Sequence, residues 1–212
     1  HNNSIMKFLF IVQGEGRGHF TQAITLEDML LRNGHQVVEV LVGKSSSRTL
    51  PGFFNRSIQA PVKRFTSPNF LPTAENKRAD LKKSFAYNLI HVPEYFRSMC
   101  YINQRIKETG AEVVINFYEL LTGLTYALFR PSVPYVCIGH QYLFLHNHFE
   151  FPRKSVIQLS MLHFFTRMTS LRASRRLALS FRKMESDRTE RISVVPPLLR
   201  REVTAMQPEQ GN

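Results

Sequence analysis

Short apolar runs alternate along the chain with longer segments in which apolar residues recur every three or four positions. The runs are nearly continuous, which is typical of strands buried on both faces of a parallel sheet. The recurring segments are typical of helices that pack one face against such a sheet. Strands are predicted at 8–12, 36–42, 58–65, 112–116, 134–139, 177–180 and 192–195, and helices at 20–31, 85–106, 120–129 and 157–171.

This alternation predicts the fold class. Strands that alternate with helices form a parallel sheet with helices on both faces, so we expect an α/β, Rossmann-like single domain with the 8–12 strand at its centre. Asn33-Gly34 is expected to end the first helix, and Pro93 is expected to kink the helix at 85–106. Within that segment the apolar residues keep near-helical spacing until Gly110 ends it: Phe85, Leu89, Val92, Phe96, Met99 and Ile106.

The two ends of the chain differ from its patterned middle. Residues 1–5 are polar and unpatterned, and we expect them to be a leader left by expression, with the genuine start at Met6. Residues 6–200 hold all the predicted elements and form the expected Rossmann-like domain. Residues 201–212 follow the Pro196-Pro197 pair, and we expect them to begin an interdomain linker. The chain is therefore expected to be a first domain cut at its linker, with the second domain absent.

The charge of the chain points to anionic partners. Its 212 residues include 28 Lys and Arg against 16 Asp and Glu, a formal net charge of +12. Such an excess favours phosphates, nucleic acid or an acidic membrane surface as partners. No motif of an RNA- or DNA-binding protein is present, so nucleic acid is not the expected partner. The basic residues gather before the 85–106 helix and in the last third of the chain: Lys77, Arg78, Lys82, Lys83, Arg167, Arg172, Arg175, Arg176, Arg182, Lys183, Arg188 and Arg191.

Cysteine content and apolar run length bear on location. Cys100 and Cys137 are the two cysteines, which excludes a disulfide framework and a cysteine-rich zinc fold and favours a reducing compartment, the cytoplasm. No run approaches the roughly 18 apolar residues that a membrane span needs. Aromatic residues in the segment 142–151 are expected to be exposed beside the basic residues, which suits a peripheral protein at the inner face of the cytoplasmic membrane.

A glycine-rich turn between the first predicted strand and helix is the most informative motif. It consists of Gly14, Glu15, Gly16, Arg17, Gly18 and His19. Such a turn lets the backbone pass close to a ligand and aims a helix N-terminus at an anion. A dinucleotide site is one interpretation, but the spacing is G-x-G-x-G and Glu39 lies within the next strand rather than at its end. A tight turn without a ligand is a second interpretation.

Two weaker patterns concern phosphate and metal ions. Gly43-Lys44-Ser45 is similar to the end of a phosphate-binding loop, but the glycine required five residues upstream is Val38. His146 and His148 stand at alternate positions without a nearby Asp or Cys, which makes a weak metal-ligand set. Neither a metal ion nor another cofactor is therefore predicted.

A third interpretation of the glycine turn comes from a family resemblance. Residues 8–31 resemble the opening of the GT-B glycosyltransferases, in which a strand enters a glycine-rich turn that ends in Gly-His. Residues 33–37, His140-Gln141 after a later strand, and residues 196–200 continue the resemblance. It is closest to the branch that contains the peptidoglycan-precursor N-acetylglucosaminyltransferase and the galactolipid synthases. Members of this family have two Rossmann-like domains; the first binds mainly the acceptor and the second mainly the nucleotide sugar.

The resemblance implies that this chain is the acceptor-side half of a glycosyltransferase. The enzyme would transfer a sugar from a nucleotide-sugar donor to an acceptor hydroxyl, with lipid-linked acceptors included, and the fragment alone is expected to be inactive. His19 would act as the general base. The remaining expected acceptor-binding residues are Gly14, Glu15, Gly16, Arg17, Gly18, Asn116, Glu119, His140 and Gln141.

Each of these side chains also has a structural interpretation. His19 would then cap the first helix or pack beneath the glycines, and Glu119 or Asn116 would cap the next helix. His140 and Gln141 would be a polar pair at the end of a strand. For the chain as a whole, the alternatives are a non-catalytic nucleotide- or ligand-binding α/β domain and a basic nucleic-acid-associated protein.

Overall fold

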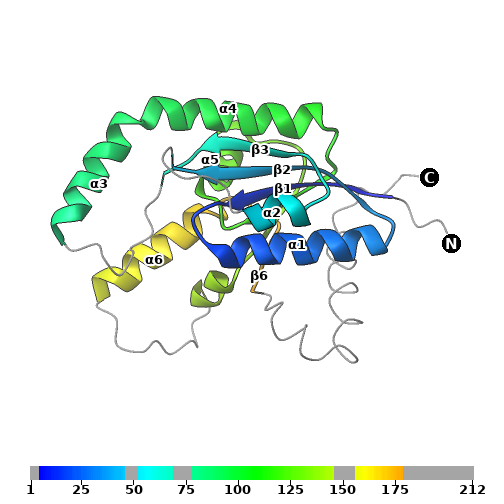
Figure 1. Cartoon of the computed structure of the whole chain (residues 1–212). Helices are drawn as coiled ribbons and strands as arrows, with labels where there is room; N and C mark the ends of the chain where they lie inside the picture. Colours follow the sequence, from blue (N-terminus) through cyan, green and yellow to red (C-terminus); the bar gives the residue numbers. More distant parts are fainter. Residues whose placement is uncertain (1–4, 46–51, 69–77, 146–155, 179–212) are drawn as a thin grey trace.

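Six parallel strands form one sheet, and β1 lies inside it (Figure 1). The computed structural model describes residues 5–45, 52–68, 78–145 and 156–178. The strand order is β3-β2-β1-β4-β5-β6, and each neighbouring pair is parallel. The predicted α/β class, the parallel sheet and the central first strand are confirmed. The strands are β1 Lys7–Gln13, β2 Gln36–Lys44, β3 Val62–Thr66, β4 Val113–Phe117, β5 Tyr135–Ile138 and β6 Arg175–Leu177.

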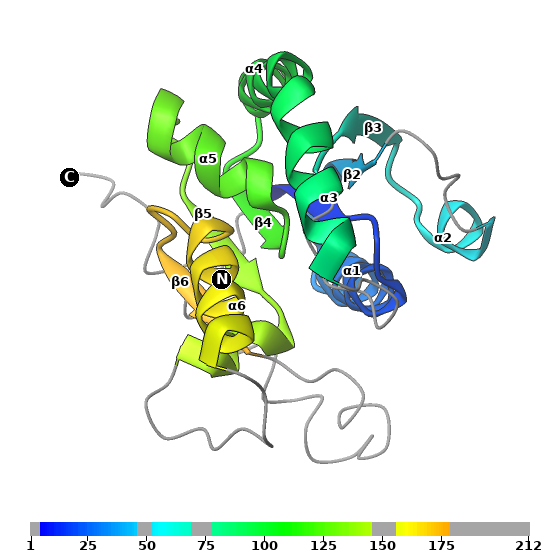
Figure 2. The same ribbon diagram turned by 90° about the vertical axis from the view of Figure 1, so that its left-hand side faces the viewer.

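Helices cover both faces of the sheet (Figures 1 and 2). On one face α1 and α2 pack in a core with alternate residues of the strands, and on the other α4, α5 and α6 do the same. A short helix, η1, follows β5. The bounds are α1 Arg17–Arg32, α2 Gly52–Ser57, α3 Arg78–Ile90, α4 Val92–Glu108, α5 Leu120–Phe129, η1 His140–Leu145 and α6 Val156–Met168.

The continuous apolar run of β1 is explained by this two-sided burial. Phe8, Phe10 and Val12 enter the core beneath α1, whereas Leu9 and Ile11 enter the core beneath α4. All five side chains are fully buried. Because successive residues of a strand point to opposite faces, a strand covered on both sides must be apolar throughout.

Several predicted boundaries differ from the observed ones. The first helix begins at Arg17 instead of residue 20, because Gly16 is its extended N-cap residue. β3 begins only after Pro61, whose carbonyl accepts a hydrogen bond from the backbone of Val40 although its ring nitrogen can donate none. The sequence did not predict α2, and the strand expected at 177–180 is Arg175–Leu177. The strand expected at 192–195 lies outside the described residues.

The long helix predicted at 85–106 is two helices. α3 ends at Ile90 and α4 begins at Val92, with His91 between them and Pro93 in the first turn of α4. The break is therefore where the proline predicted a kink, because a proline removes a helical hydrogen bond. The stripe of apolar residues is buried only at its C-terminal end: Phe85 is 66% exposed, whereas Ile106 is 1% exposed. Helical spacing is therefore not accompanied by burial along its whole length, because α3 projects beyond the sheet (Figure 1).

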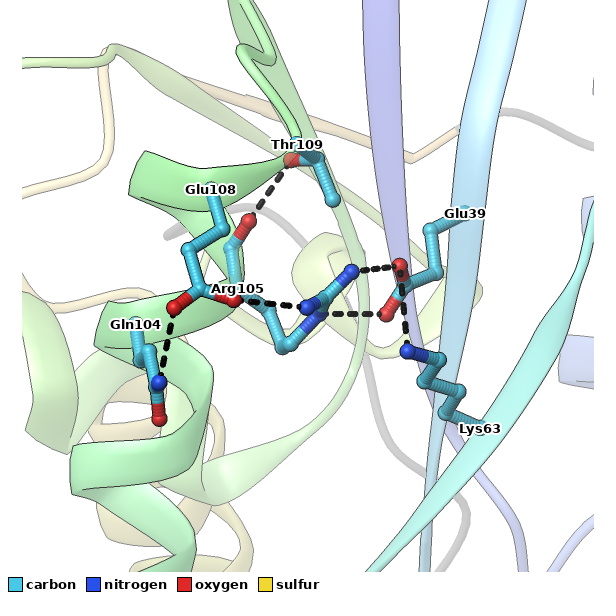
Figure 3. A network of polar contacts seen from close by, with 6 residues as sticks. All are labelled: Glu39, Lys63, Gln104, Arg105, Glu108 and Thr109. Atoms are coloured by element: carbon cyan, nitrogen blue, oxygen red, sulfur yellow. Dashed lines mark hydrogen bonds and ion pairs between the residues drawn. The ribbon is translucent and has the colours of Figure 1, made fainter.

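A half-buried ion pair joins α4 to the sheet (Figure 3). Glu39 of β2 accepts hydrogen bonds from two nitrogens of Arg105, one of them at 2.9 Å, and Lys63 of β3 lies 4.0 Å from the same carboxylate. Glu108 also accepts a hydrogen bond from Arg105, at 2.9 Å. The hydrogen bond to Glu39 raises the pKa of Arg105. Glu39 is therefore engaged on the face covered by α4 and does not reach a ligand at the glycine turn, which removes the acidic residue that a dinucleotide site requires.

Candidate active site

The candidate site lies where the order of the strands reverses. β2 and β3 continue the sheet on one side of β1, and β4, β5 and β6 continue it on the other. The loops that leave the carboxyl ends of β1 and β4 therefore diverge, and open α/β sheets bind ligands in the crevice between such loops. Figure 2 looks onto this edge of the sheet, from which α3 and α6 project.

The glycine turn is bound tightly to the end of β2. The backbone of Gly14 donates a 2.8 Å hydrogen bond to the carbonyl of Gly43. A Cβ atom on Gly14 would lie 2.6 Å from that carbonyl oxygen, so only glycine fits. Glu15 accepts hydrogen bonds from the backbone and the hydroxyl of Ser45, at 2.9 and 2.8 Å. These contacts fix the path of the backbone into α1.

The N-terminus of α1 faces the crevice without a side-chain cap. Gly16 supplies no side chain for capping, and the first turn contains no acidic residue. Arg17 and Gly18 are exposed there. Because the first N–H groups of a helix carry a partial positive charge, this end of α1 favours an anionic group.

His19 is buried beneath the turn. It is 7% exposed, and its ring stacks on Tyr118 with a centroid distance of 5.5 Å and an interplanar angle of 23°. Within the described part of the chain, its Nδ1 atom is buried and has no hydrogen-bond partner. Burial, and to a smaller extent the charge of His140, lowers the pKa of His19 to about 4. The imidazole is therefore neutral at pH 7.

His140 and Gln141 reach the same edge from β5. They are the first residues of η1, directly after Gly139 at the carboxyl end of that strand. His140 is exposed and lies close enough to His19 to lower its pKa. The Oε1 atom of Gln141 is buried and without a partner among the residues that the structure describes. The two segments expected to share an edge of the sheet thus do so.

The side chains of Glu119 and Asn116 are buried and hydrogen-bonded to other groups of the protein. Glu119 is the N-cap residue of α5: its carboxylate accepts hydrogen bonds from the backbone of Leu121 and the hydroxyl of Ser67. Asn116 accepts a hydrogen bond from the backbone of Glu119 and donates one of 2.8 Å to the carbonyl of Thr169. Burial raises the pKa of Glu119 to about 7, against the lowering effect of its hydrogen bonds. Both side chains hold the end of β4 in place.

Tyr118 is the residue of this edge that sequence reasoning missed. Its φ of 63° lies in the left-handed region, which side chains other than glycine rarely adopt. A glycine or asparagine at this position would have indicated the turn, but a tyrosine gives no such signal. The prediction that the aromatic residues of segment 142–151 are exposed is wrong for Tyr142. Its side chain is 1% exposed, and its hydroxyl is hydrogen-bonded to that of Thr169. His146 and His148 lie outside the described residues.

The family of the chain follows from a comparison with known proteins. The family model of glycosyl transferase family 1 matches residues 6–212. The chain therefore belongs to this family, which confirms the expected glycosyltransferase class; the finer resemblance to the branch with lipid acceptors stays a prediction. None of the curated proteins compared with the chain matches it.

Three solved structures are similar in outline. UGT2 of Phytolacca americana, complexed with UDP-2-fluoro-glucose and pterostilbene, is 14% identical, with a TM-score of 0.42, and the match covers 66% of this chain and 32% of that one. SsfS6, a glycosyltransferase of Streptomyces sp. SF2575, is 13% identical (TM-score 0.43; 84% and 51% covered). UGT71G1 of Medicago truncatula, complexed with UDP-glucose, is 13% identical (0.40; 68% and 31%). The chain thus spans between about a third and a half of their lengths.

Proposed function

We propose that this chain is the acceptor-side domain of an enzyme that transfers a sugar from a nucleotide-sugar donor to an acceptor hydroxyl. The observation that carries the proposal is His19: a buried, neutral imidazole with an unpartnered nitrogen, placed at the switch point of the sheet. The unpaired atom is Nδ1, whereas the Cδ2–Nε2 edge of the ring faces the glycine turn beside the bare N-terminus of α1, so Nε2 is the nitrogen that a ligand in the crevice would meet. Membership of glycosyl transferase family 1 supplies the reaction class.

In the proposed reaction, His19 takes the proton of the acceptor hydroxyl. The Cδ2–Nε2 edge of its ring faces the glycine turn, since a Cβ atom on Gly16 would lie 3.4 Å from Cδ2 and 3.8 Å from Nε2. A hydroxyl that enters over Gly16 therefore meets Nε2. Its O–H bond breaks as the oxygen forms a bond to the sugar, while the bond from the sugar to the diphosphate breaks and the nucleoside diphosphate leaves with the electron pair. Such assistance contributes about 100- to 10,000-fold in rate.

The low pKa of His19 makes it a weak base until a negative charge approaches. A nearby anion favours the protonated form of a histidine and raises its pKa. The diphosphate of the donor, held at the bare N-terminus of α1, would supply that charge at the moment when the proton moves. We propose that the donor is bound mainly by a second domain, as the resemblance to the GT-B glycosyltransferases implies.

The test of the proposed reaction is sugar transfer by the protein joined to its donor-binding domain. Release of nucleoside diphosphate from nucleotide sugars, dependent on an added acceptor, is the expected result. This chain alone serves as the control and is expected to show no turnover and only weak binding of nucleotide sugars. Micromolar binding of a nucleotide sugar to this chain by calorimetry would contradict the division of roles, and tight binding without transfer would favour a non-catalytic ligand-binding domain.

We further propose that the enzyme works on an acceptor at an anionic membrane surface, and that α3 makes the contact. Phe85 and Leu89 are 66% and 62% exposed on one side of α3, and Tyr87 and Ile90 are exposed on another. Lys82 is exposed in the same helix, next to Lys83, which is exposed too. A helix with apolar residues on several sides suits a nonpolar surrounding, and the lysines suit anionic headgroups.

The position of α3 supports this contact. The helix projects from the carboxyl edge of the sheet, where the candidate site lies (Figure 1). An apolar groove of about 320 Å³ runs along its base, between Phe85 and Leu89 on one side and Leu120 and Leu124 on the other. None of the helices in the described ranges is long and apolar enough to cross a bilayer, so the proposed contact is a surface contact.

Vesicle binding tests the membrane proposal. Binding to vesicles of phosphatidylcholine with phosphatidylglycerol is expected to weaken with salt and to fall when Lys82 and Lys83 are both changed to Gln, by about 2 kcal/mol for the pair. Phe85→Ser with Leu89→Ser is expected to abolish binding. Leu128→Ser, near the C-terminal end of α5, is the matched control because Leu128 is similarly exposed but lies on another helix. Equal binding by all three variants, or salt-insensitive binding, would contradict the proposal.

A further inference from the structure

The side chain of Tyr118 contacts both His19 and α6, a helix far away in the sequence. Its ring is fully buried between the imidazole of His19 on one side and the rings of Tyr142 and Phe165, at centroid distances of 5.8 and 5.4 Å. Its hydroxyl is 2.8 Å from the hydroxyl of Thr166 in the last turn of α6. The tyrosine is therefore the one ring in the described residues that touches both the candidate base and α6.

The end of α6 that holds Tyr118 is itself fixed to the strands. Thr169, which follows α6, accepts a hydrogen bond from Asn116 at the end of β4 and is bonded to the hydroxyl of Tyr142 at 2.8 Å. Gly123 of α5 lies so close to the carbonyl of Met168 that a Cβ atom would overlap it. This end of α6 is thus hydrogen-bonded to β4 and η1 and closely packed against α5.

We propose that Tyr118 is the positioning residue of His19. Its left-handed backbone conformation and its hydrogen bond to Thr166 hold the ring stacked on the imidazole. The Tyr118 ring shields His19 from water and keeps the Cδ2–Nε2 edge of the imidazole turned toward Gly16. The consequence for the rate depends on the proposed role of His19 as a base, whereas the orientation and shielding of the imidazole do not.

An aromatic ring stacked on His19 suits a base that becomes positively charged. The described residues provide no carboxylate hydrogen-bonded to His19 to stabilise an imidazolium. The face of an aromatic ring attracts a cation whose centre lies within about 6 Å, and the Tyr118 ring centroid is 5.5 Å from that of His19. Tyr118 therefore attracts the imidazolium that proton transfer creates, but its exclusion of water is the larger effect, because burial is the main cause that lowers the pKa of His19 to about 4.

The test that does not depend on activity is an NMR titration of His19 in this chain. Tyr118→Gly removes the ring and suits the left-handed backbone. Water then reaches the imidazole, and the pKa of His19 is expected to rise from about 4 toward its ordinary value of 6.5. Tyr126→Ala is the matched control, because Tyr126 is a buried tyrosine that is bonded to Val133 and has no contact with His19 among the described residues. An unchanged His19 pKa in folded Tyr118→Gly would overturn the proposal.

The bond to Thr166 is tested by a double-mutant comparison. Tyr118→Phe and Thr166→Val each remove one hydroxyl of the same hydrogen bond. Each variant is therefore expected to shift the pKa of His19 slightly, and the double variant is expected to shift it no further than either single variant. In the active enzyme, Tyr118→Leu is expected to lower kcat at least tenfold with little change in KM, and Tyr118→Phe is expected to restore most of the loss. Additive shifts, or equal kcat in the Leu and Phe variants, would refute the role of the ring. If Tyr118→Gly raises the pKa but sugar transfer is absent, the positioning stands and the proposed function fails.

Discussion

Two turns at the carboxyl edge of the sheet each bury one titratable side chain. The turn after β1 buries His19, and the turn after β4 buries Glu119, which is 1% exposed. Burial moves both toward their neutral forms: the pKa of His19 falls to about 4 and that of Glu119 rises to about 7. The difference lies in their partners, since Glu119 is bonded to Ser67 and Leu121, whereas Nδ1 of His19 has no partner in the described structure.

This difference separates a structural group from a candidate functional one. A shifted pKa alone does not make the distinction, because burial by itself shifts both groups. Glu119 accepts two hydrogen bonds at Oε1 from Ser67 and Leu121, caps α5 and so stabilises the turn. His19 has no such partner at Nδ1, and the Cδ2–Nε2 edge of its ring faces the glycine turn, where a ligand can reach it. The comparison therefore favours a catalytic role for His19 in the turn after β1 and a structural role for Glu119 in the turn after β4.

The largest expected effect is on turnover. In the active enzyme, His19→Ala is expected to lower kcat by about 100- to 10,000-fold while acceptor affinity changes little, because the base acts in the transition state. Glu119→Gln, which keeps an oxygen able to accept the bonds from Ser67 and Leu121, is expected to change kcat only a few-fold. Steady-state kinetics of both variants decide the matter. A greater loss in Glu119→Gln than in His19→Ala would reverse the assignment.

The two groups are expected to have opposite effects on stability as the pH changes. Between about pH 4 and 6.5 the unfolded chain carries a proton on His19 that the folded protein lacks, so this group makes unfolding free energy rise with pH, by about 3 kcal/mol in all. Between about pH 4.5 and 7 the folded protein keeps a proton on Glu119 that the unfolded chain has lost. This group makes unfolding free energy fall with pH by a similar amount.

Urea unfolding across this pH range would separate the two contributions. Relative to the unmodified chain, His19→Gln should lose stability as the pH rises, because only the Glu119 contribution remains. Glu119→Gln should gain stability as the pH rises, because only the His19 contribution remains. Parallel stability curves for the three proteins would show that neither group is as strongly perturbed as its burial indicates.

Glycines beside the two turns are expected to respond differently to an added methyl group. A Cβ atom on Gly43 would lie 2.3 Å from Oε2 of Glu119, so Gly43→Ala is expected to cost about 1–3 kcal/mol through overpacking. A Cβ atom on Gly18 meets nothing within 4 Å, and Gly18 lies in α1. Gly18→Ala is therefore expected to gain about 0.5–1 kcal/mol. Thermal unfolding gives both values, and the same sign for both would contradict the packing described for the second turn.

A further small effect is expected from the Ser67 hydroxyl that supports Glu119. Ser67→Ala removes one hydrogen bond to the carboxyl group and should cost about 1 kcal/mol. It should also raise the pKa of Glu119 further, because that bond lowers it. Carbonyl NMR of the Glu119 side chain would detect the change, with Ser160→Ala as a control on the exposed side of α6. A fall in the Glu119 pKa would show that the bond favours the protonated form.

Much of the framework could be predicted because it depends on local periodicity. The run of β1, the glycine turn and the helical spacing after it are neighbours in sequence, and a strand buried on both faces requires apolar residues throughout. The placement of His19 near the carboxyl edge followed from the same segment. The break between α3 and α4 also followed from Pro93, whose effect is local.

The partners of the buried polar groups could not be predicted in this way. Ser67 and Glu119 are 52 residues apart, and Glu39 and Arg105 are 66 apart. Whether an acidic side chain caps a helix, anchors another or faces a ligand depends on which distant element packs against it. The left-handed φ of Tyr118 likewise has no sequence signal, since a tyrosine rarely adopts this conformation.

The sequence by itself thus determined the α/β class, the parallel sheet, its central strand and the turn that carries His19, because each of these follows from the order of apolar and glycine residues over short distances. Only the tertiary structure decided that Nδ1 of His19 is unpaired while Oε1 of Glu119 accepts hydrogen bonds from Ser67 and Leu121. It also decided that the apolar stripe of α3 and α4 is exposed at one end and buried at the other. The physical reason is that burial and hydrogen bonding depend on contacts between residues far apart in the chain, which a local pattern does not specify.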